Sequence, residues 1–464
     1  MKQLRKSIRV CALLLAVMVL LPMAYGAYSL IRYGTRWRTS EYNSYLTSMK
    51  SGVIPGNIYD RGGVLLAASD PDTGSRVYAG SEAVRRAAVH VVGDNRGTVK
   101  NAVESFMAEY LYGARMTFRE RLRQSRQDAL RGDDVTLTLD SGLCAYIAAQ
   151  FPQDKAGAAV VMNYRTGELL ALVSFPSFDP AAGAAVGVSQ ALNRATRWLS
   201  APGSTFKIVT LTSALQNLAD VEGRAFTCTG GVSFGEHQRT VSDYGGTAHG
   251  SLTLRRAFAQ SCNSTFAVLA AELGDKALRR TAEDFGIGDD FTFRDLVVEN
   301  SSFSSAAPPL LGADIAWTGV GQHQLALTPL HMCMIAAAVA NDGVMMEPRL
   351  LLRVTTPAGQ ERAAFEPLVY RTALSPQTAA ALKSYMRDVI VSGTGSAAAV
   401  RGLTVCGKTG SAEIDTQEKD NAWFVGFIDN PDMPYAVCVA VQNAGIGGSV
   451  AAPLARMIFE YVGK

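Results

Sequence analysis

The sequence lacks an excess of charge of either sign. Its 464 residues include 44 Lys and Arg against 41 Asp and Glu, so the formal net charge is only +3. A nucleic-acid-binding surface needs a concentrated basic field, which this near-balance does not provide, and we expect no nucleic-acid partner. With 48% hydrophobic and 18% charged residues, the composition is that of a folded protein rather than a disordered one. The length predicts two or three folded units.

Cysteine pairs with a recognisable spacing are also missing. The seven cysteines are an odd number, contain no Cys-x-x-Cys pair and match no zinc knuckle. We therefore expect neither a disulfide framework nor a metal site, and most of the thiols should be small buried side chains. Oxidation of one pair, such as Cys228 with Cys262, stays open at this stage.

The amino terminus is basic and is followed by a long apolar run. Residues 1–9 contain four Lys or Arg, and residues 10–31 contain no charge. Twenty-two such residues are enough to cross about 30 Å of hydrocarbon. We predict a cytoplasmic tail at 1–9 and a single membrane anchor at 10–31, with the rest of the chain exported. A cleaved signal peptide is the alternative, because small residues occur at 24–26.

The pattern of polar and apolar residues along the remaining chain changes near residue 135. Residues 34–135 are polar and mixed, and we interpret them as a small non-catalytic domain, with an arginine-rich solvated helix face at 115–131. Strand patterns follow at 135–139, 158–164 and 169–174 and return at 403–406, 423–428 and 435–441, before a terminal helix from 451. Helical patterns dominate between these two groups. We predict an α+β domain at 136–464, in which strands from both ends of the domain complete one sheet.

A serine and a lysine lie one helical turn apart after a Pro-Gly pair. Ser204 and Lys207 begin a helix at 202–209, so both side chains should share one face. Serine needs a base because its hydroxyl is hardly ionised at neutral pH. Lys207 would serve only if burial or a neighbouring cation lowered its pKa from about 10.4. Taken alone, this Ser-x-x-Lys spacing is a weak signal.

Two further motifs follow in a defined order. Ser261 and Asn263 form a Ser-x-Asn group in a stretch predicted to be helical, and Lys408, Thr409 and Gly410 form a Lys-Thr-Gly group at the end of a strand. This ordered set is the constellation of penicillin-recognising serine acyltransferases. Residues 402–409 also satisfy the phosphate-loop pattern, but a phosphate loop joins a strand to a helix, whereas residues 403–406 are strand-like and 411–421 are turn-like.

With these motifs, the chain resembles the class B penicillin-binding proteins, which are membrane-anchored D,D-transpeptidases of bacterial cell-wall synthesis. Residues 54–63 resemble the family's amino-terminal signature, although Pro55 and Asn57 depart from the commoner version. Residues 157–180, 193–195, 249–250, 321–322, 328–329, 340–343 and 422–427 are similar to other family blocks. The resemblance implies a serine β-lactamase-like transpeptidase fold with a helical subdomain, and the region 34–135 is short for the family's pedestal domain.

The resemblance also implies roles for individual residues. Ser204 would be the nucleophile and Lys207 its base, while Ser261 would relay a proton and Asn263 would bind the substrate amide. Lys408 would depress the pKa of Lys207 and attract the substrate carboxylate. The remaining substrate contacts would come from Thr409, Gly410 and Ser411, and the backbone N–H groups of Ser204 and Ser411 would form the oxyanion hole.

No metal or organic cofactor is required by this chemistry. The implied ligands are peptidoglycan stem peptides ending in D-Ala-D-Ala and β-lactams, and a membrane glycosyltransferase is the implied partner because no glycan-polymerising domain fits in residues 34–135. A D,D-carboxypeptidase and a non-catalytic penicillin-binding sensor or scaffold remain as alternatives. We interpret Cys262 as a packing residue, His249 as a turn element, and Trp423 and Phe424 as core.

Overall fold

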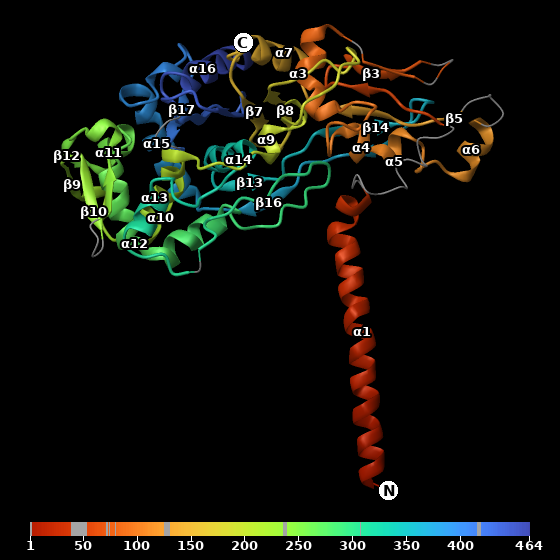
Figure 1. Ribbon diagram of the computed structural model, residues 1–464, viewed down its shortest axis with the longest axis horizontal. Helices are drawn as coiled ribbons and strands as arrows, with labels where there is room; N and C mark the ends of the chain where they lie inside the picture. The colour runs from red at the N-terminus through yellow and green to blue at the C-terminus, as the bar shows by residue number, and fades with distance from the viewer. Residues whose placement is uncertain are drawn as a thin grey trace.

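The computed structural model describes residues 2–38, 53–70, 73, 75–78, 80–124, 130–234, 239–306, 308–414 and 419–464. Its first element is one long helix, α1 (Lys2–Arg38), which extends away from the rest of the chain (Figure 1). Residues 5–31 of this helix form a candidate membrane span, whose most apolar 18-residue window has a mean hydropathy of 2.3 and contains no buried residue. The predicted anchor at 10–31 lies inside this span.

A five-stranded antiparallel sheet forms the centre of the main domain. Its strand order is β17-β18-β19-β7-β8, so strands from both ends of the domain lie side by side, as predicted. Apart from a few positions near their ends, every residue in these strands is buried, which explains the nearly continuous apolar sequences of all of them except β17. The strands are β7 (Gly157–Asn163), β8 (Leu169–Phe175), β17 (Val405–Ala412), β18 (Asn421–Ile428) and β19 (Tyr435–Val441).

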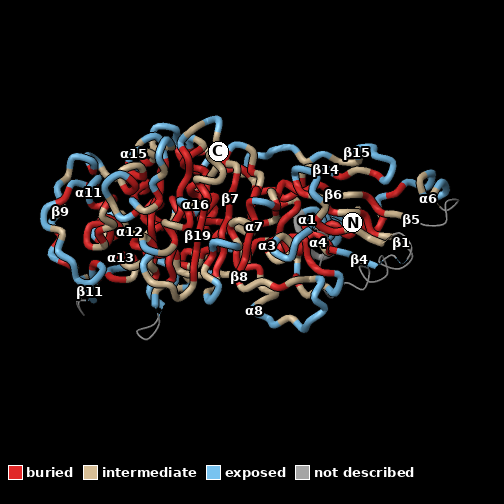
Figure 2. The backbone as a smooth tube through the Cα atoms, turned by 90° about the horizontal axis from the view of Figure 1, so that it is seen from above, coloured by how far each residue is buried: buried red, intermediate tan, exposed pale blue. Residues whose placement is uncertain are grey.

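Helices cover both faces of this sheet (Figure 1). The helix α14 (Pro329–Ala340) is buried at every residue and packs on β7, β18 and β19, while α7 (Ser141–Gln150) and α16 (Ala451–Val462) cover the other face. Burial of the central strands is visible in Figure 2. The α+β architecture predicted from the strand and helix patterns is therefore confirmed.

A second sheet of six strands extends across the predicted domain boundary at residues 135 and 136. Its order is β15-β14-β6-β2-β3-β4, and the boundary falls inside β6. β6 pairs with β2 from the amino-terminal region and with β14 from the main domain, so the two regions share one sheet. The strands are β2 (Ile58–Tyr59), β3 (Leu65–Ser69), β4 (Arg76–Tyr78), β6 (Asp134–Leu137), β14 (Leu351–Thr355) and β15 (Glu361–Ala364).

Short helices pack beside this sheet. They are α3 (Glu82–Val92), α4 (Val103–Phe106), α5 (Ala108–Leu111) and α6 (Phe118–Gln124). The helix α6 contains no buried residue, in agreement with the solvated helix face predicted for this region, of which residues 125–129 lie outside the described part of the chain.

The middle of the main domain contains strands that the sequence pattern missed. Two hairpin-like pairs, β9 (Ala225–Cys228) with β12 (Gly250–Thr253) and β10 (Gly231–Phe234) with β11 (Arg239–Ser242), lie beside the helices expected there. Each strand has four residues and few buried positions, so none shows a clear alternation. The neighbouring helices are α10 (Lys207–Asn217), α11 (Leu254–Ala259), α12 (Asn263–Asp284), α13 (Ala313–Gly319) and α15 (Pro376–Ser392).

The remaining elements are short. They are β1 (Val53–Ile54), β5 (Leu130–Arg131), β13 (Val344–Met346), β16 (Val369–Thr372), α8 (Val188–Ala191), α9 (Arg194–Arg197), η1 (Gly203–Phe206), η2 (Val221–Gly223), η3 (Tyr244–Gly246) and η4 (Ser396–Ala398).

A buried ion pair holds the amino-terminal region together and provides a test of the fold. Arg76 Nε donates to Glu104 Oε1 at 2.6 Å, and both side chains are nearly inaccessible to solvent. Removing the carboxylate charge in Glu104→Gln leaves the guanidinium buried without a counter-charge, which should cost about 3–5 kcal/mol of stability. Glu82→Gln breaks an exposed pair with Arg86 and should cost less than about 1 kcal/mol. Urea unfolding of both variants measures this difference, and equal losses would contradict the prediction.

Candidate active site

A short helical turn places Ser204 and Lys207 on one face. Ser204 lies in η1, whose three-residue turns stack residues i and i+3, and Lys207 begins α10 directly afterwards. Gly203 has a φ of +56°, and a Cβ there would lie 2.7 Å from the backbone oxygen of Ser411. The missing side chain therefore lets the turn pack directly on β17.

The Lys-Thr-Gly group lies inside β17 rather than after it. Lys408 pairs with Val425 and Ser411 with Ala422 in an unbroken antiparallel ladder with β18. No helix follows this strand within the described residues, since the chain continues from 413–414 and 419–420 into β18. A phosphate loop is thus excluded by the local structure, because such a loop must open a helix.

Ser261 lies at a break between two helices, which corrects the prediction that its stretch is continuously helical. It has a φ of +60°, in the left-handed region, and separates α11 from α12. Asp243 holds the start of α12, because its carboxylate accepts hydrogen bonds from the backbone N–H groups of Asn263 at 2.6 Å and of Ser264 at 3.2 Å. The break turns the Ser261 side chain toward the two lysines.

Hydrogen bonds join the three motifs. Lys408 Nζ donates to Ser261 Oγ at 2.8 Å and to the backbone oxygen of Thr409 at 2.9 Å. Lys207 Nζ donates to the backbone oxygen of Ser261 and to Asn263 Oδ1, both at 2.6 Å, and lies 3.5 Å from Ser261 Oγ. The Ser261 hydroxyl therefore connects the two amines.

One predicted contact is not made in this structure. No hydrogen bond joins Lys207 Nζ to Ser204 Oγ, although both residues lie in the described part of the chain. The Asn263 carboxamide is already engaged, since its Oδ1 accepts from Lys207 and its Nδ2 donates to the Ser242 backbone oxygen at 2.8 Å. Hydrogen bonds of catalytic groups often tighten only when substrate is bound.

Burial determines the pKa values of the two lysines. The side chains of Lys207 and Lys408 are fully inaccessible to solvent. Desolvation lowers the pKa of Lys207 to about 7, against an opposing effect of Cys262 and Asp243. Burial and then the nearby charge of Lys207 hold the pKa of Lys408 well below its ordinary value. At least one of the amines is therefore available as a free base near neutral pH.

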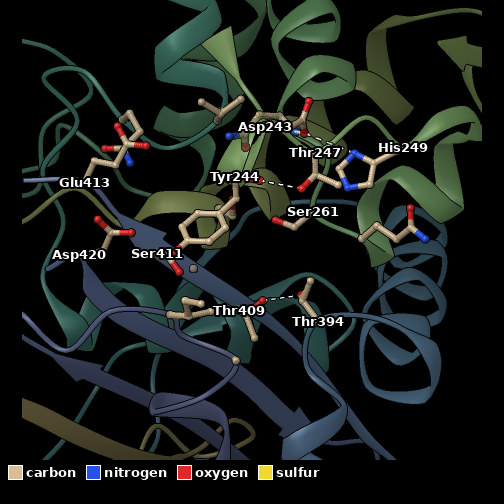
Figure 3. Close-up of a pocket in the computed structure, with 18 of the residues that line it drawn as sticks. Asp243, Tyr244, Thr247, His249, Ser261, Thr394, Thr409, Ser411, Glu413 and Asp420 are labelled. Atoms are coloured by element: carbon tan, nitrogen blue, oxygen red, sulfur yellow. Dashed lines mark hydrogen bonds and ion pairs between the residues drawn. The ribbon is translucent and has the colours of Figure 1, made fainter. Parts of the chain in front are cut away.

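A cavity of about 230 Å³ opens over these motifs (Figure 3). Asp243 and His249 lie at one end, Glu413 and Asp420 at the other, and Ser261, Thr409 and Ser411 between them. The residues that sequence reasoning missed lie in segments without a motif, so their position in the cavity could be found only from the fold. They include Tyr244, Thr247, Gln260, Trp317, Val320, Thr394, Glu413, Asp420, Ile446 and Gly448.

Trp423 and Phe424, interpreted as core from the sequence, are fully buried in β18. Trp423 stacks on Trp198 with ring centroids 5.5 Å apart. Neither residue is among those that line the cavity, so both support the sheet beneath the site.

Four side chains with metal-binding atoms come together beside the Ser-x-Asn group. They are Cys228, Asp243, His249 and Cys262, and their donor atoms all lie within 4.8 Å of one another. Two thiolates, an imidazole and a carboxylate form a donor set that Zn²⁺ accepts in four-coordinate sites. The spacing of the cysteines gave no sign of this cluster because its members come from four separate segments. All seven cysteines are free, so Cys228 and Cys262 are not joined.

This arrangement changes two interpretations made from the sequence. His249 is more than a turn element, since its Nδ1 lies 3.3 Å from Cys228 Sγ and 3.6 Å from Asp243 Oδ1. Cys262 is fully buried and also caps α12, because its sulfur accepts from the N–H of Thr265 at 3.4 Å. The Cys228–Asp243–His249–Cys262 cluster could hold a zinc ion that ties β9 and β12 to the start of α12.

We expect the purified full-length chain to carry about one Zn²⁺ per molecule, measured by elemental analysis, because the four donors complete a tetrahedral set. His249→Ala and Cys228→Ser should each lower the zinc content strongly, whereas Cys144→Ser, which alters a buried thiol of α7, should leave it unchanged. A zinc-free wild-type chain would contradict the prediction, and peptide mapping would then show whether Cys228 and Cys262 are oxidised to each other.

Comparisons with known proteins agree with the geometry. Peptidoglycan D,D-transpeptidase PbpA of Mycolicibacterium smegmatis is 32% identical over 329 residues, which are 65% of this chain and 65% of that protein. Peptidoglycan D,D-transpeptidase MrdA of Acinetobacter baumannii is 29% identical over 379 residues, covering 72% of this chain and 55% of MrdA. The chain thus spans about two thirds or less of the length of these curated relatives.

Solved structures match over nearly the whole chain. Penicillin-binding protein A from M. tuberculosis, solved as a ceftriaxone acyl-enzyme complex, superposes with a TM-score of 0.80 at 29% identity and covers 90% of this chain and 100% of its own. A family model described as the penicillin binding protein transpeptidase domain matches residues 157–460. Because this match covers well over half of the residues and contains all three motifs, the chain belongs to the penicillin-binding proteins that carry a transpeptidase domain.

Proposed function

We propose that this chain is a peptidoglycan D,D-transpeptidase that cross-links stem peptides through an acyl-enzyme on Ser204. The observation that carries the proposal is the convergence of three distant motifs, with the Ser261 hydroxyl between the amines of Lys207 and Lys408 beside the cavity that Ser204 lines. The names of the relatives, peptidoglycan D,D-transpeptidases, support the same activity.

Acylation begins when Lys207 accepts the hydroxyl proton of Ser204. The Ser204 oxygen then forms a bond to the carbonyl carbon of the penultimate D-Ala, and the amide C–N bond to the terminal D-Ala breaks. The departing amine takes a proton that reaches it through Ser261, whose hydroxyl already contacts both lysines. Every proton transferred during acylation therefore moves between motif residues and the substrate.

The negative charge on the carbonyl oxygen needs donors during this step. We assign this role to the backbone N–H groups of Ser204 and Ser411, because η1 packs directly on β17 at this point. Loss of one such donor typically costs about 3–4 kcal/mol of transition-state stabilisation. Asn263 is assigned to the substrate amide, which requires its carboxamide to exchange or share the contacts that it makes now.

The other end of the substrate is an anion. Thr409, Gly410 and Ser411 line the cavity, and Lys408 Nζ donates to the backbone oxygen of Thr409 behind them, so we assign these residues to the terminal carboxylate of the stem peptide or of a β-lactam. Ser411 Oγ accepts from the N–H of Gly447 at 3.1 Å, which leaves its own hydrogen free to donate.

Transfer of the acyl group to an amine of a second strand distinguishes a transpeptidase from a D,D-carboxypeptidase, which transfers it to water. The chemistry of Ser204 is the same in both. The names of the relatives favour the transpeptidase. A non-catalytic sensor is disfavoured because a binding protein would not need two buried amines connected through a hydroxyl.

The place of action follows from α1. We propose that residues 10–31 cross the bacterial cell membrane once, that residues 1–9 stay in the cytoplasm, and that the transpeptidase domain lies outside, where peptidoglycan is assembled. A membrane glycosyltransferase that supplies nascent glycan strands is proposed as the partner. The small region at 34–135, which shares its sheet with the main domain, would set the height of the active site above the membrane.

Replacement of the nucleophile tests the proposed function. In Ser204→Ala, no covalent adduct with fluorescent penicillin should form, because the attacking oxygen is absent, while the circular dichroism spectrum should stay that of the wild type. Ser251→Ala removes an exposed hydroxyl of β12 and should label normally. Peptide mass spectrometry of the wild-type adduct should locate it on Ser204. Labelling of the Ser204→Ala variant would overturn the assignment.

The pKa of Lys207 predicts the pH dependence of acylation. Because burial lowers that pKa to about 7, the free amine dominates above this pH and the ammonium below it. The second-order rate constant of acylation by penicillin G should therefore rise with pH through about 7 and level off above about 8. Stopped-flow measurements with a fold check at each pH provide the profile. A rate that rises only near pH 10 would show that the base has the pKa of an ordinary lysine amine, and would contradict the prediction.

A further inference from the structure

The helix α6 carries an apolar side that faces away from the protein. Phe118 and Leu122 lie four residues apart, so their side chains share one face of the helix. They are 80% and 49% exposed, respectively. Two large apolar side chains next to each other on one short helix indicate a contact surface, whereas single exposed apolar residues are common on any protein.

The opposite side of α6 is fixed to the protein by polar contacts. Glu120 Oε1 accepts from the guanidinium of Arg362 in β15 at 2.9 Å, and Gln124 Oε1 accepts from the backbone N–H of Arg131 in β5 at 2.8 Å. Each of these acceptors follows one of the two apolar residues by two positions, which is about 200° around a helix. The contacts therefore rotate α6 so that its apolar side points outward.

Arginines flank the apolar side. In the helical arrangement, Arg119 and Arg123 lie on one flank and Arg121 lies on the other, and all three are exposed. Among the described residues, no carboxylate forms an ion pair with any of them. Glu120 is the one acidic residue of α6 and is already paired with Arg362. The outward side of the helix thus combines two apolar groups with uncompensated positive charge.

The chain arrives from α1 directly beside this helix. β1 follows α1 after residues 39–52 and pairs in parallel with β5, where Ile54 lies opposite Arg131. The N–H of Arg131 also holds Gln124, so α6, β5 and β1 are neighbours. A chain of 14 residues spans at most about 50 Å, which keeps this part of the protein within that distance of the end of α1. Figures 1 and 2 show α6 at the end of the molecule opposite to α15.

We propose that α6 is a second membrane contact, in which Phe118 and Leu122 enter the interface of a bilayer that contains anionic phospholipids and the flanking arginines bind lipid phosphates. The proposal rests on the proposed insertion of α1 as a membrane anchor. Basic helices with one apolar side bind in the plane of the headgroups, because apolar burial and attraction to anionic lipids act together. Arginine suits this role since its guanidinium donates two parallel hydrogen bonds to a phosphate.

The anchor favours a lipid surface over a protein as the occupant of this side. Once α1 is inserted, a membrane is always present at high effective concentration near α6, whereas a protein partner has to be recruited. A second contact also has a mechanical consequence. One attachment through α1 does not determine the tilt of the protein over the membrane, but two attachments do. Because Arg362 of β15 joins α6 to the six-stranded sheet, docking of α6 sets the orientation of the main domain and its cavity.

A tryptophan placed in α6 tests the proposal on the full chain. Phe118→Trp keeps an aromatic side chain at the contact, and Val391→Trp places one at an exposed position of α15, at the opposite end of the molecule. Each protein is reconstituted in vesicles of phosphatidylglycerol and phosphatidylcholine, with part of the phosphatidylcholine brominated close to the headgroup. Subtraction of the wild-type signal gives the emission of the added tryptophan. Since bromine quenches at short range, the emission added by Phe118→Trp should be largely lost and that added by Val391→Trp should be kept.

The charge dependence identifies the lipid that α6 binds. Each arginine near an anionic surface strengthens binding about fivefold, so neutralising two of them should weaken docking about 25-fold. In the Phe118→Trp background, Arg119→Gln with Arg123→Gln should therefore remove most of the quenching, as should vesicles of phosphatidylcholine alone. Arg256→Gln with Arg401→Gln removes the same charge from exposed positions elsewhere and should leave the quenching unchanged. Circular dichroism checks the fold of every variant.

Three results would contradict the proposal in different ways. Full emission from Phe118→Trp in the anionic vesicles would overturn it and would indicate a protein as the partner of α6. Equal quenching in vesicles with and without phosphatidylglycerol would overturn the recognition of anionic lipid. A wild-type chain that does not float with the vesicles in a density gradient would reject the proposed anchor, and the second contact with it, whereas flotation without quenching rejects the second contact alone.

Discussion

Two buried lysine side chains that form no ion pair with a carboxylate of the described residues are the constraint on which the site depends. Moving an ammonium group out of water is costly unless it is paired, and Lys207 and Lys408 donate to neutral oxygens, mainly those of Ser261, Asn263 and Thr409, and face the rings of Phe266 and Phe258. The cost is reduced when the amines release protons: burial lowers the pKa of both lysines, and the nearby charge of Lys207 lowers the pKa of Lys408 further. The surrounding core must offset the remainder. In return, the site holds an amine, that of Lys207, which can accept a proton near neutral pH because its pKa is about 7.

Direct contacts between backbone segments, made possible by glycines, place Ser204 next to the two lysines. A Cβ on Gly321 would lie 1.8 Å from the backbone oxygen of Gly203, and a Cβ on Gly410 would lie 2.7 Å from that of Pro202. Three chain segments thus touch without intervening side chains, which brings η1 close to β17. Any side chain at these glycines would separate Ser204 from the N–H of Ser411, so catalytic geometry here is a matter of backbone packing.

The sequence was informative wherever a short motif carried its own chemistry or a strand was buried on both faces. Ser204, Ser261 and Asn263 line one cavity, the amines of Lys207 and Lys408 meet the Ser261 hydroxyl beside it, and the central sheet has the strands expected from the sequence pattern. It failed where structure depends on contacts between distant segments. The shared sheet that crosses residue 135, the short strands β9 to β12, the cysteine–histidine cluster and Thr394 have no local periodicity or spacing that distinguishes them.

The conformation of Ser261 shows why the motif alone does not specify the site. A left-handed backbone is unfavourable for serine and persists only when its surroundings hold it. On one side, the N–H of Cys262 donates to the Ala257 backbone oxygen at 2.9 Å, and on the other, Asp243 holds the N–H groups of Asn263 and Ser264. Asp243 lies outside the motif and belongs to the Cys228–Asp243–His249–Cys262 cluster. The hydroxyl that connects the two lysines is therefore positioned by residues that contribute no chemistry of their own, and the proton relay depends on them as much as on the serine.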